Sequence, residues 1–489
     1  MTIARHKTAI RRYKLSKPVN LLLENALLDK EECFFDYGCG HGQDIEILTK
    51  SGYNANGYDP HYRPDIKPET SDVVNLGFVL NVIESPAERD KTLAAAFGIT
   101  GKVLCVAVMT ILQKGYDGED FSDGVLSARG TFQKYFEQEE IKEYLESNLG
   151  KDAVALEPGI FLIFKEEQQK LQFLETRKYR KRLATGLHTM ERPSPVLRPS
   201  FLDIVKDAPE LPVVVDFIMD HGRVPAIEES EAWASLIANY GSKNKMQKVI
   251  GTMIDTDALQ PVIDQRKEDL RIFYALRRFD KRGYPKAGDL PLSTSRDIRE
   301  FFGSYKAFLD KTNELLFSVG RENIVTKAFG KVKLGKHLPD AVYIHPCLVD
   351  KMPPEIQVII GLASSLLGEI EECNLLKVNK VKRKVSFMVY EDFDKVPHPA
   401  LRYCFVVDFR DRSIKRWNFE ERENPPILHR KETFVDEEYA GYNKFAKLTK
   451  QEEKADLLSS NSIGTKKAWE ALLKENGLVI KGHQLKKAT

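Results

Sequence analysis

The sequence has no pair of cysteines at C-x-x-C spacing and no long apolar run. Its six cysteines are scattered along 489 residues, so we expect neither a disulfide framework nor a thiolate zinc site, and the distribution fits a reducing cytoplasm. The longest strongly apolar stretch, Gln357–Gly368, is too short to span a bilayer, and Met1–Lys17 is too charged for a secretory signal. The sequence therefore predicts a cytoplasmic protein without a membrane partner.

The chain also lacks an excess of charge of either sign and any internal repeat. It carries 74 basic and 72 acidic residues, so its net charge gives no argument for binding nucleic acid. No repeat is apparent at periods of about 20–50 residues. With 42% hydrophobic residues, the chain is folded, but it is too long for one core, which serves about 250–300 residues. Two or three domains are expected.

A glycine-rich segment near the N-terminus carries the clearest chemical signal. Phe34 and Phe35 predict a buried strand, and residues 36–42 then read D-Y-G-C-G-H-G. Glycine permits the positive φ angles of a sharp strand-to-helix turn and lets a ligand approach the backbone closely. The dinucleotide fingerprint requires its third glycine at a different spacing. The segment predicts a backbone-lined pocket for an adenosine-type cofactor.

Further strands follow the glycine-rich segment. Asp59 comes after a short second strand, close to the ~20-residue distance at which an acid meets ribose hydroxyls in cofactor-binding βαβ folds. A third strand begins at Asp72 and passes Gly77, Glu88–Phe97 predicts a helix, and Lys102–Met109 predicts a Val-rich strand. This order predicts an α/β fold, a Rossmann-like parallel sheet with its ligand at the carboxyl ends of the strands.

The spacing of Asp36 and the three glycines resembles motif I of the class I S-adenosylmethionine (SAM)-dependent methyltransferases, and the resemblance covers roughly residues 30–165. It implies SAM as the cofactor, with the glycine segment around the methionine moiety. Asp36 would order that segment or contact the amino group, and Asp59 would take the ribose hydroxyls. Asp72 is either a cofactor residue or only a strand cap. The implied cofactor-binding residues are Asp36, Gly38, Cys39, Gly40, Gly42, Asp59, Asp72 and Asn75.

The candidates for catalysis are less well defined. Asn75–Phe78 is similar to the N-P-P-F/Y motif of amino-group methyltransferases, but Leu76 and Gly77 replace both prolines, so adenine-N6 or cytosine-N4 chemistry is not predicted. Asn81 stands where a similar branch often has histidine. Residues 131–136 either close over the pocket as a substrate lid or join the core. Because methyl transfer mainly requires positioning of a nucleophile, the catalytic residue stays open; the candidates are Asn75, Asn81 and Tyr135.

A second resemblance spans nearly the whole chain. Its segments are Ala4–Ile10, Phe35–Gly40, Asp72–Glu84, Gly130–Phe136, Pro193–Ser200, Phe302–Tyr305 and Asn424–Glu432. Together they resemble the putative methyltransferases associated with bacterial DNA-phosphorothioation gene clusters. The resemblance implies a defence-island protein whose partners are proteins of such a cluster. The family name records gene neighbourhood, so it implies no substrate.

Basic residues are clustered in two parts of the chain, although the net charge is near zero. Residues 1–17 are basic without any acid, and a second basic cluster follows the first domain. Such runs either form solvated helix faces or neutralise phosphates. If they flank the cofactor pocket, they form a track for nucleic acid, for which DNA is the more plausible form. The candidate residues are Arg5, Lys7, Arg11, Arg12, Arg177, Lys178, Arg180, Lys181 and Arg182.

Composition shifts predict four segments. They are a methyltransferase domain with a basic arm (1–168), a basic, Pro-rich linker (169–200), a mainly helical domain (201–330) and an α+β domain with a helical C-terminal tail (331–489). Asp152–Lys165 predicts a hairpin that closes the first sheet. The aromatic stripe along Ile298–Phe317 predicts a helical core face, and Ser413–Phe419 is expected to pair with Tyr403–Phe409.

The last segment contains histidines and acids that can bind a metal ion or support hydrolysis. They are Asp392, Asp394, His398, His429, Lys431 and Glu432, with His337, Asp340 and His345 upstream. No two histidines form a helical i, i+4 pair, and no H-E-x-x-H motif occurs. We favour a structural or recognition role for this group and predict no metal site.

Three functions follow from the sequence. The leading hypothesis is a SAM-dependent methyltransferase that acts on nucleic acid, with the later domains as recognition modules. The second is a methyltransferase for a small molecule, which the near-neutral net charge favours. The third is a non-catalytic SAM sensor or scaffold in a defence complex, which the missing histidine at Asn81 favours.

Overall fold

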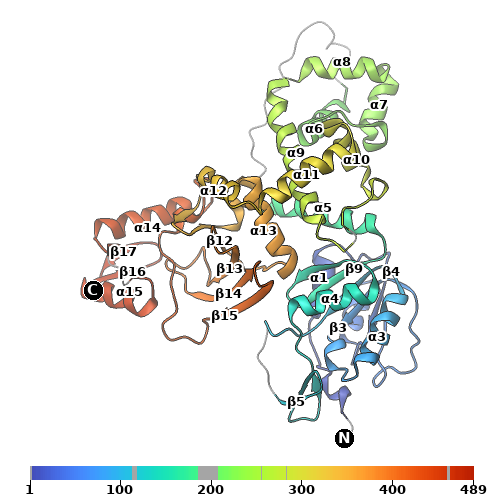
Figure 1. Cartoon of the computed structure of the whole chain (residues 1–489), viewed down its shortest axis with the longest axis vertical. Helices are drawn as coiled ribbons and strands as arrows, with labels where there is room; N and C mark the ends of the chain where they lie inside the picture. The colour runs from blue at the N-terminus through green and yellow to red at the C-terminus, as the bar shows by residue number, and fades with distance from the viewer. Residues whose placement is uncertain are drawn as a thin grey trace. The chain divides into compact units, whose positions relative to one another are not determined.

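The computed structural model describes the backbone of residues 3–112, 118–184, 208–254, 256–281, 283–459 and 463–488. Its contacts divide the chain into two units, whose residues can be found in Figure 1 from the colour bar of residue numbers. One unit combines Met1–Glu166 with Arg321–Thr489, and the other is Glu167–Gly320. The sequence predicted boundaries at 168 and 330, and the division into four segments stays a prediction. The prolines of the predicted linker lie outside the described residues.

A six-stranded sheet forms the first half of the first unit. Its order is β2 (Asn54–Tyr58), β1 (Cys33–Tyr37), β3 (Ser71–Gly77), β4 (Thr100–Ala107), β9 (Ile160–Phe164) and β8 (Ala153–Glu157). The first four strands are parallel, and β9 runs antiparallel to both β4 and β8. The sheet is the predicted Rossmann-like α/β arrangement, and the predicted closing hairpin is β8–β9.

Helices cover both faces of this sheet. Alternate strand residues such as Phe35, Val74 and Leu104 pack with α3 (Pro86–Gly98) and α4 (Gln138–Leu149). On the other face, α1 (Lys17–Glu24) contacts β3 and β4, and α2 (Gln43–Lys50) contacts β2. A small sheet of β5 (Glu119–Phe121), β6 (Gly124–Leu126) and β7 (Phe132–Gln133) follows β4.

The second half of this unit is an antiparallel sheet. Its order is β10 (Lys336–Leu338), β11 (Ala341–Ile344), β12 (Leu375–Asn379), β13 (Lys384–Tyr390), β14 (Leu401–Asp408) and β15 (Ser413–Asn418). The predicted pairing of the last two strands is confirmed. Helices α12 (Glu322–Lys331) and α13 (Pro354–Leu367) pack on one face through Phe329 and Ile356. This packing explains why α12 belongs with the sheet and not with the helical unit.

The end of α13 adjoins the edge strand β8. The amide of Glu369 donates to the carbonyl of Leu156 at 3.0 Å, and Gln138 Nε2 donates to the carbonyl of Leu367 at 3.2 Å. A Cβ atom on Gly368 would lie 2.8 Å from the Cα atom of Glu157, so the two backbones meet closely. The contact covers the free edge of the first sheet, which would otherwise offer unpaired backbone groups.

The C-terminal tail contains α14 (Tyr442–Lys454) and α15 (Lys466–Glu475) and then a hairpin of β16 (Leu478–Ile480) and β17 (Leu485–Lys487). The predicted helical tail is therefore wrong at its end. Gly477 and Gly482 adopt φ values of +61° and +56°, which end the helix and turn the chain, and Val479 and Ile480 favour a strand.

The second unit is helical, as predicted. Its helices are α5 (Glu167–Ala184), α6 (Leu211–His221), α7 (Glu231–Tyr240), α8 (Lys243–Met253), α9 (Thr256–Arg277), α10 (Leu292–Phe302) and α11 (Tyr305–Ser318). The predicted stripe lies in the core around Phe308. It is split between two helices because Gly303 has a φ of +76° and Ser304 Oγ accepts from the amide of Ala307 at 3.1 Å.

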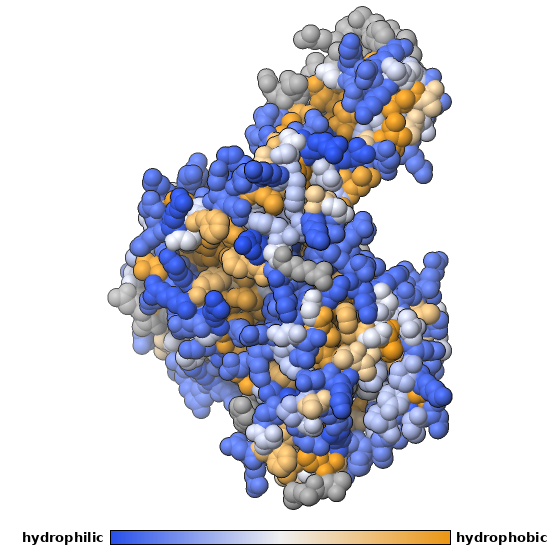
Figure 2. All heavy atoms as spheres, turned by 45° about the vertical axis from the view of Figure 1, so that its right-hand side comes forward, coloured by the Kyte–Doolittle hydropathy of each residue, from blue (hydrophilic) through white to orange (hydrophobic). Residues whose placement is uncertain are grey.

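The remaining short helices are 3-10 turns, namely η1 (Arg5–Thr8), η2 (Leu80–Val82), η4 (Ile227–Glu229), η5 (Ala287–Asp289), η6 (Pro346–Lys351) and η7 (Lys431–Phe434). Figure 2 shows a face covered largely by hydrophilic residues, with hydrophobic residues gathered in separate patches. Within the described part of the chain, no helix has the length and apolar character that crossing a membrane requires.

Candidate functional site

The glycine segment lies at the carboxyl ends of β1 and β2. Tyr37 pairs with Tyr58 at the ends of these parallel strands. The amides of Gly38 and Cys39 both donate to the carbonyl of Tyr58, at 2.8 and 3.1 Å. The chain then turns into α2, whose first turn follows Gly42. The segment therefore lies at the edge of the sheet where ligands bind in open α/β folds.

The three glycines adopt backbone angles that other residues rarely take. Gly38, Gly40 and Gly42 have φ values of +91°, +54° and +80°. A Cβ atom on Gly38 would lie 2.4 Å from Val79 Cγ2, and one on Gly40 would lie 3.2 Å from the Cβ atom of Ala9. Glycine is needed here both for conformation and for space. The turn presents the N-terminal end of α2 with its positive partial charge.

Asp59 follows β2 directly, and its carboxylate is held by the backbone. Oδ2 accepts from the amide of Gly40 at 3.0 Å, and Oδ1 accepts from the amides of His61 and Tyr62, each at 2.9 Å. A carboxylate offers about four acceptor positions, so these bonds leave about one for a ligand hydroxyl. Asp59 thus ties the glycine segment to the end of β2. Its role as the ribose acceptor stays a prediction.

Asp36 and Asn75 face each other on neighbouring strands. The register of β1 and β3 pairs them, and Asn75 Nδ2 donates to Asp36 Oδ1 at 2.8 Å. Both side chains are buried, and burial, reinforced by the nearby charge of Asp44, raises the pKa of Asp36 to about 7. Asn75 Oδ1 is buried and accepts no hydrogen bond from any described residue. The pair suits a ligand that brings N–H donors or positive charge.

The N-terminal arm, residues 4–16, lies against the glycine segment. The Cβ atom of Ala9 would lie 3.2 Å from a Cβ atom on Gly40. Tyr62 Oη donates to the carbonyl of His6 at 2.9 Å, and the rings of His6 and His61 stack with centroids 4.3 Å apart. The arm and the turn after Asp59 therefore form one wall beside the predicted cofactor pocket.

Arg5 fixes the arm to α3. Its guanidinium donates to Glu84 Oε2 at 2.8 Å and to Glu88 Oε2 at 2.7 Å. The amide of Ala4 donates to the carbonyl of Gly130 at 3.1 Å, in the turn between β6 and β7. Arg5, predicted to contact phosphate, is thus engaged by two carboxylates. The arm is held at both the α3 side and the small sheet.

Arg63 is a site residue that sequence reasoning missed. Its backbone amide donates to the carbonyl of Asp59 at 3.0 Å, and a Cβ atom on Gly42 would lie 3.2 Å from its Nη1. Burial raises the pKa of the Cys39 thiol to about 12, while the Arg63 guanidinium acts in the opposite direction. Cys39 is therefore not a thiolate nucleophile. The only sequence signal for Arg63 is its place four residues after the acid.

The structure corrects the placement of Asp72. Asp72 lies at the start of β3, at the amino ends of the strands, and Asn75 is the residue that faces Asp36. Its Oδ2 accepts from the amide of Cys33 at 3.1 Å, and its Oδ1 lies 3.8 Å from Lys102 Nζ. The glycine segment lies at the opposite edge, so the prediction that Asp72 binds the cofactor is wrong. Asp72 instead caps the start of a strand, which was the alternative expectation from sequence.

The catalytic candidates lie around the carboxyl ends of β3 and β4. Asn81 is buried in η2, and its carbonyl accepts from the amide of Lys134 at 2.7 Å. The amide of Phe136 donates to the carbonyl of Met109 at 3.0 Å. These bonds bring Tyr135 to the same edge of the sheet as the glycine segment. Phe136 itself is buried in the core.

Phe78 was not predicted as a site residue but has an unusual backbone. It follows β3 directly with a φ of +60°, and its amide donates to the carbonyl of Ala107 at 2.7 Å. Bulky residues rarely adopt this left-handed conformation, and such strain is concentrated at functional sites. Phe78 therefore joins Asn81 and Tyr135 among the residues that border this edge of the sheet.

The predicted nucleic-acid residues are divided between the two units. Lys7 and Arg11 are exposed on the arm, and Arg12 is half-buried. The other basic cluster lies on α5, where Arg177 stacks over Phe173 at 5.9 Å. The side chains of Lys178, Arg180, Lys181 and Arg182 lie outside the described residues. Within the first unit, the arm is a basic segment that lies next to the glycine segment.

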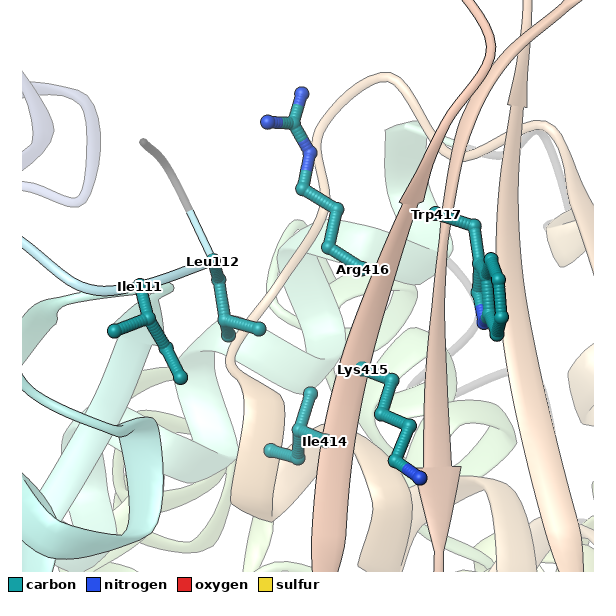
Figure 3. A pocket seen from close by; sticks show the side chains of 6 residues that line it. All are labelled: Ile111, Leu112, Ile414, Lys415, Arg416 and Trp417. Carbon is teal, nitrogen blue, oxygen red and sulfur yellow. The ribbon is translucent and has the colours of Figure 1, made fainter. Parts of the chain in front are cut away.

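The first unit also contains a pocket of about 340 Å³, lined by residues outside the glycine segment. Figure 3 shows Ile111 and Leu112 on one side and Ile414, Lys415, Arg416 and Trp417 of β15 on the other. Leu112 and Ile414 belong to the same hydrophobic cluster. None of these residues comes from the glycine segment, so this pocket is not the predicted cofactor site.

Comparison with models of protein families and with curated proteins finds no match. Solved structures of methyltransferases do resemble part of the chain. An amino pentose methyltransferase from Micromonospora echinaspora is 14% identical, with 30% of this chain and 90% of that chain covered and a TM-score of 0.24. A SAM-dependent methyltransferase from Clostridium acetobutylicum is 12% identical over 32% and 93%, with a TM-score of 0.25. A possible histamine N-methyltransferase from Thermotoga maritima is 15% identical over 33% and 92%, with a TM-score of 0.21. At these values the likeness carries no argument about activity.

Proposed function

We propose that the first sheet and its helices form a SAM-dependent methyltransferase. The observation that carries this proposal is the glycine turn at the ends of β1 and β2, with Asp59 hydrogen-bonded to the amide of Gly40. A turn of positive-φ glycines beside an acid is the arrangement that an adenosine cofactor with ribose hydroxyls requires. The Rossmann-like arrangement of the first sheet is consistent with this proposal.

The residues present fit this cofactor. Asp59 has acceptor capacity left for a ribose hydroxyl. Asp36 and the unsatisfied Asn75 Oδ1 suit an ammonium group. The Arg63 side chain beside Gly42 suits a carboxylate. One cofactor that carries all three groups is SAM.

When bound, SAM supplies an electrophilic methyl group on a sulfonium. The chain's task is then to orient a nucleophile and to exclude water. The arm covers one side of the glycine segment. Phe78, Asn81 and Tyr135 border the edge of the sheet where a substrate would be placed. Burial raises the pKa of the Cys39 thiol, which disfavours the thiolate that a covalent role would require.

The proposed substrate is nucleic acid, with DNA favoured over RNA. Lys7 and Arg11 are exposed on the arm, which contacts Gly40 through Ala9. Positive charge beside the cofactor segment attracts a phosphate backbone. The resemblance to the phosphorothioation-associated methyltransferases supports a place in a bacterial DNA-modification or phage-defence system, in the cytoplasm, with other proteins of that system as partners.

A non-catalytic SAM sensor or scaffold is one alternative. Asn81 is buried where related enzymes often have histidine, and an amide cannot take up a proton as an imidazole does. A small-molecule methyltransferase is the other alternative and is favoured by the near-neutral net charge.

The test is transfer of a methyl label from SAM to separate pools of bacterial DNA, RNA, protein and small metabolites. The full chain is compared with Gly40→Arg, which blocks the turn, and with Gly98→Arg as a control, because Gly98 is exposed with open space around it. We expect label in the DNA pool for the full chain and the control, and at least ~100-fold less for Gly40→Arg.

The other outcomes separate the candidates. Label in the metabolite pool alone overturns the nucleic-acid substrate but keeps the methyltransferase. SAM binding without label in any pool supports the sensor. Equal label with Gly40→Arg contradicts the assignment of the site.

A further inference from the structure

Two histidines in the C-terminal part of the first unit are brought together by an antiparallel pairing of two loops. Ala400 forms an antiparallel bridge with Ile427, and the amide of Leu428 donates to the carbonyl of Pro399 at 3.0 Å. In this register, the residue opposite His398 is His429. Opposed residues of an antiparallel pair lie side by side on one face, and the two imidazole centroids are 4.5 Å apart.

A carboxylate from a third segment completes the cluster. Glu452 lies on α14, and its side chain is 1% exposed. One potential ligand atom from each of His398, His429 and Glu452 lies within 4.8 Å of the others. Three donors that bind one ion at about 2.0–2.2 Å are at most about 4.4 Å apart. The 4.8 Å bound lies within a few tenths of an ångström of this limit, a difference that small side-chain rotations can remove.

The donor atoms are poised in the way that metal ligands require. His429 Nε2 lies 2.8 Å from the carbonyl of Ile463; with its N–H donated there, Nδ1 carries the free lone pair. Nδ1 is buried without a hydrogen-bond partner among the described residues. Metal-binding histidines commonly donate their other N–H to a backbone carbonyl in this manner.

The carboxylate of Glu452 also lacks hydrogen-bond partners among the described residues. Both of its carboxylate oxygens are buried, and neither has a hydrogen-bond partner within the described part of the chain. Oε1 lies 2.8 Å from His398 Nε2, yet their geometry is not that of a hydrogen bond. Two ligands at right angles on one ion at about 2.0–2.1 Å are about 2.9 Å apart. Burying a carboxylate without hydrogen-bond donors costs free energy. A bound cation would offset that cost.

The surroundings agree with a dedicated site. Trp469 packs against both imidazoles, with centroids 4.9 Å from His398 and 4.6 Å from His429, and forms a dry wall. The nearby amine of Lys431 is not a competing partner for Glu452, because it donates to the carbonyls of Phe393 and Val396 at 2.6 Å each. Among the described residues, no cationic side chain donates a hydrogen bond to Glu452.

We propose that His398, His429 and Glu452 bind a divalent first-row transition-metal ion. Two imidazoles and one carboxylate are ligands that zinc, iron(II) and manganese accept, and three protein ligands leave a position for water or a substrate. The site is separate from the glycine segment and does not depend on the proposed methyl transfer. It changes the expectation from sequence, which included no metal.

The test uses the full chain, stripped with a chelator and reloaded with Zn²⁺ or Co²⁺. Bound metal is measured by mass spectrometry after gel filtration, and Co²⁺ ligation is followed by visible absorption. We expect about one ion per chain. Glu452→Gln, which keeps the shape of the side chain, and His429→Gln, which removes the imidazole, should each lower metal affinity at least ~10-fold. His345→Gln should not, because His345 is a half-buried histidine outside the cluster that accepts from the amide of Cys347.

Two results would overturn the proposal. One is a reloaded chain that holds less than about a tenth of an equivalent of either ion. The other is unchanged binding in both cluster variants, which would place the ion elsewhere. Circular dichroism of each variant identifies any that fails to fold, and the metal content of the unaltered chain decides the question in that case.

Discussion

The glycine segment and the cluster of His398, His429 and Glu452 are built in different ways. The first is almost contiguous in sequence, because one strand-to-helix turn supplies most of it and Asp59 adds the rest. The second joins three segments that are brought together by the Ala400–Ile427 bridge and the packing of α14. A contiguous site is visible in sequence, whereas a site made by antiparallel register becomes visible only when the register is known.

The largest effect is expected when a methyl group is added within the glycine segment, which is crowded. Gly38→Ala places a Cβ atom 2.4 Å from Val79 at a φ of +91°. Left-handed strain of about 1–2 kcal/mol and overpacking of about 1–3 kcal/mol should together lower the melting temperature by roughly 5–10 °C. Gly130→Ala is the matched control, because Gly130 has a φ of +71° and open space around it. This substitution should lower the melting temperature by about 2–4 °C. Equal losses would show that the glycine turn is not crowded.

The sequence predicts the glycine segment better than the C-terminal cluster, because only the glycine segment is nearly contiguous in sequence. The parallel strands, the glycine turn and Asp59 are local patterns, and the structure has them where they were expected. Asp72 was misplaced because the sequence does not show which end of β3 faces the site. Arg63 was missed because it acts from a turn without a motif. Glu452 was missed because it lies on a helix far along the chain from His398.

SAM affinity should depend on pH through Asp36. Its pKa is raised to about 7, so the folded chain loses stability relative to the unfolded chain as pH rises from about 4 to 7. The same ionisation creates the negative charge that favours a cationic cofactor. SAM binding should therefore tighten by up to about tenfold between pH 5.5 and 7.5, with proton release. Calorimetry in buffers of different ionisation enthalpy measures this, and Asp36→Asn should remove the dependence.

A pH-independent affinity in the unaltered chain would mean that Asp36 does not face the cofactor. Metal binding by the C-terminal cluster serves as the internal comparison, because Asp36→Asn should leave it unchanged.

The smallest effects are expected within the arm. Arg5→Ala removes the ion pairs with Glu84 and Glu88. These pairs are partly exposed, so the loss is modest, and we expect SAM affinity to fall about two- to fivefold as the arm loosens. Lys7→Ala should leave SAM affinity unchanged but weaken DNA binding uniformly across sequences and reduce its salt slope by about 1. Fluorescence anisotropy at several salt concentrations distinguishes the two variants. An unchanged salt slope in Lys7→Ala would remove the arm from the proposed DNA track.

The central claim is that the glycine turn and Asp59 hold SAM. Titration of the full chain with SAM in a calorimeter, beside Gly40→Arg and Gly98→Arg, tests it most directly. The account predicts saturable binding at one site for the full chain and Gly98→Arg and none for Gly40→Arg. No binding to the full chain, or equal binding to all three proteins, would contradict it.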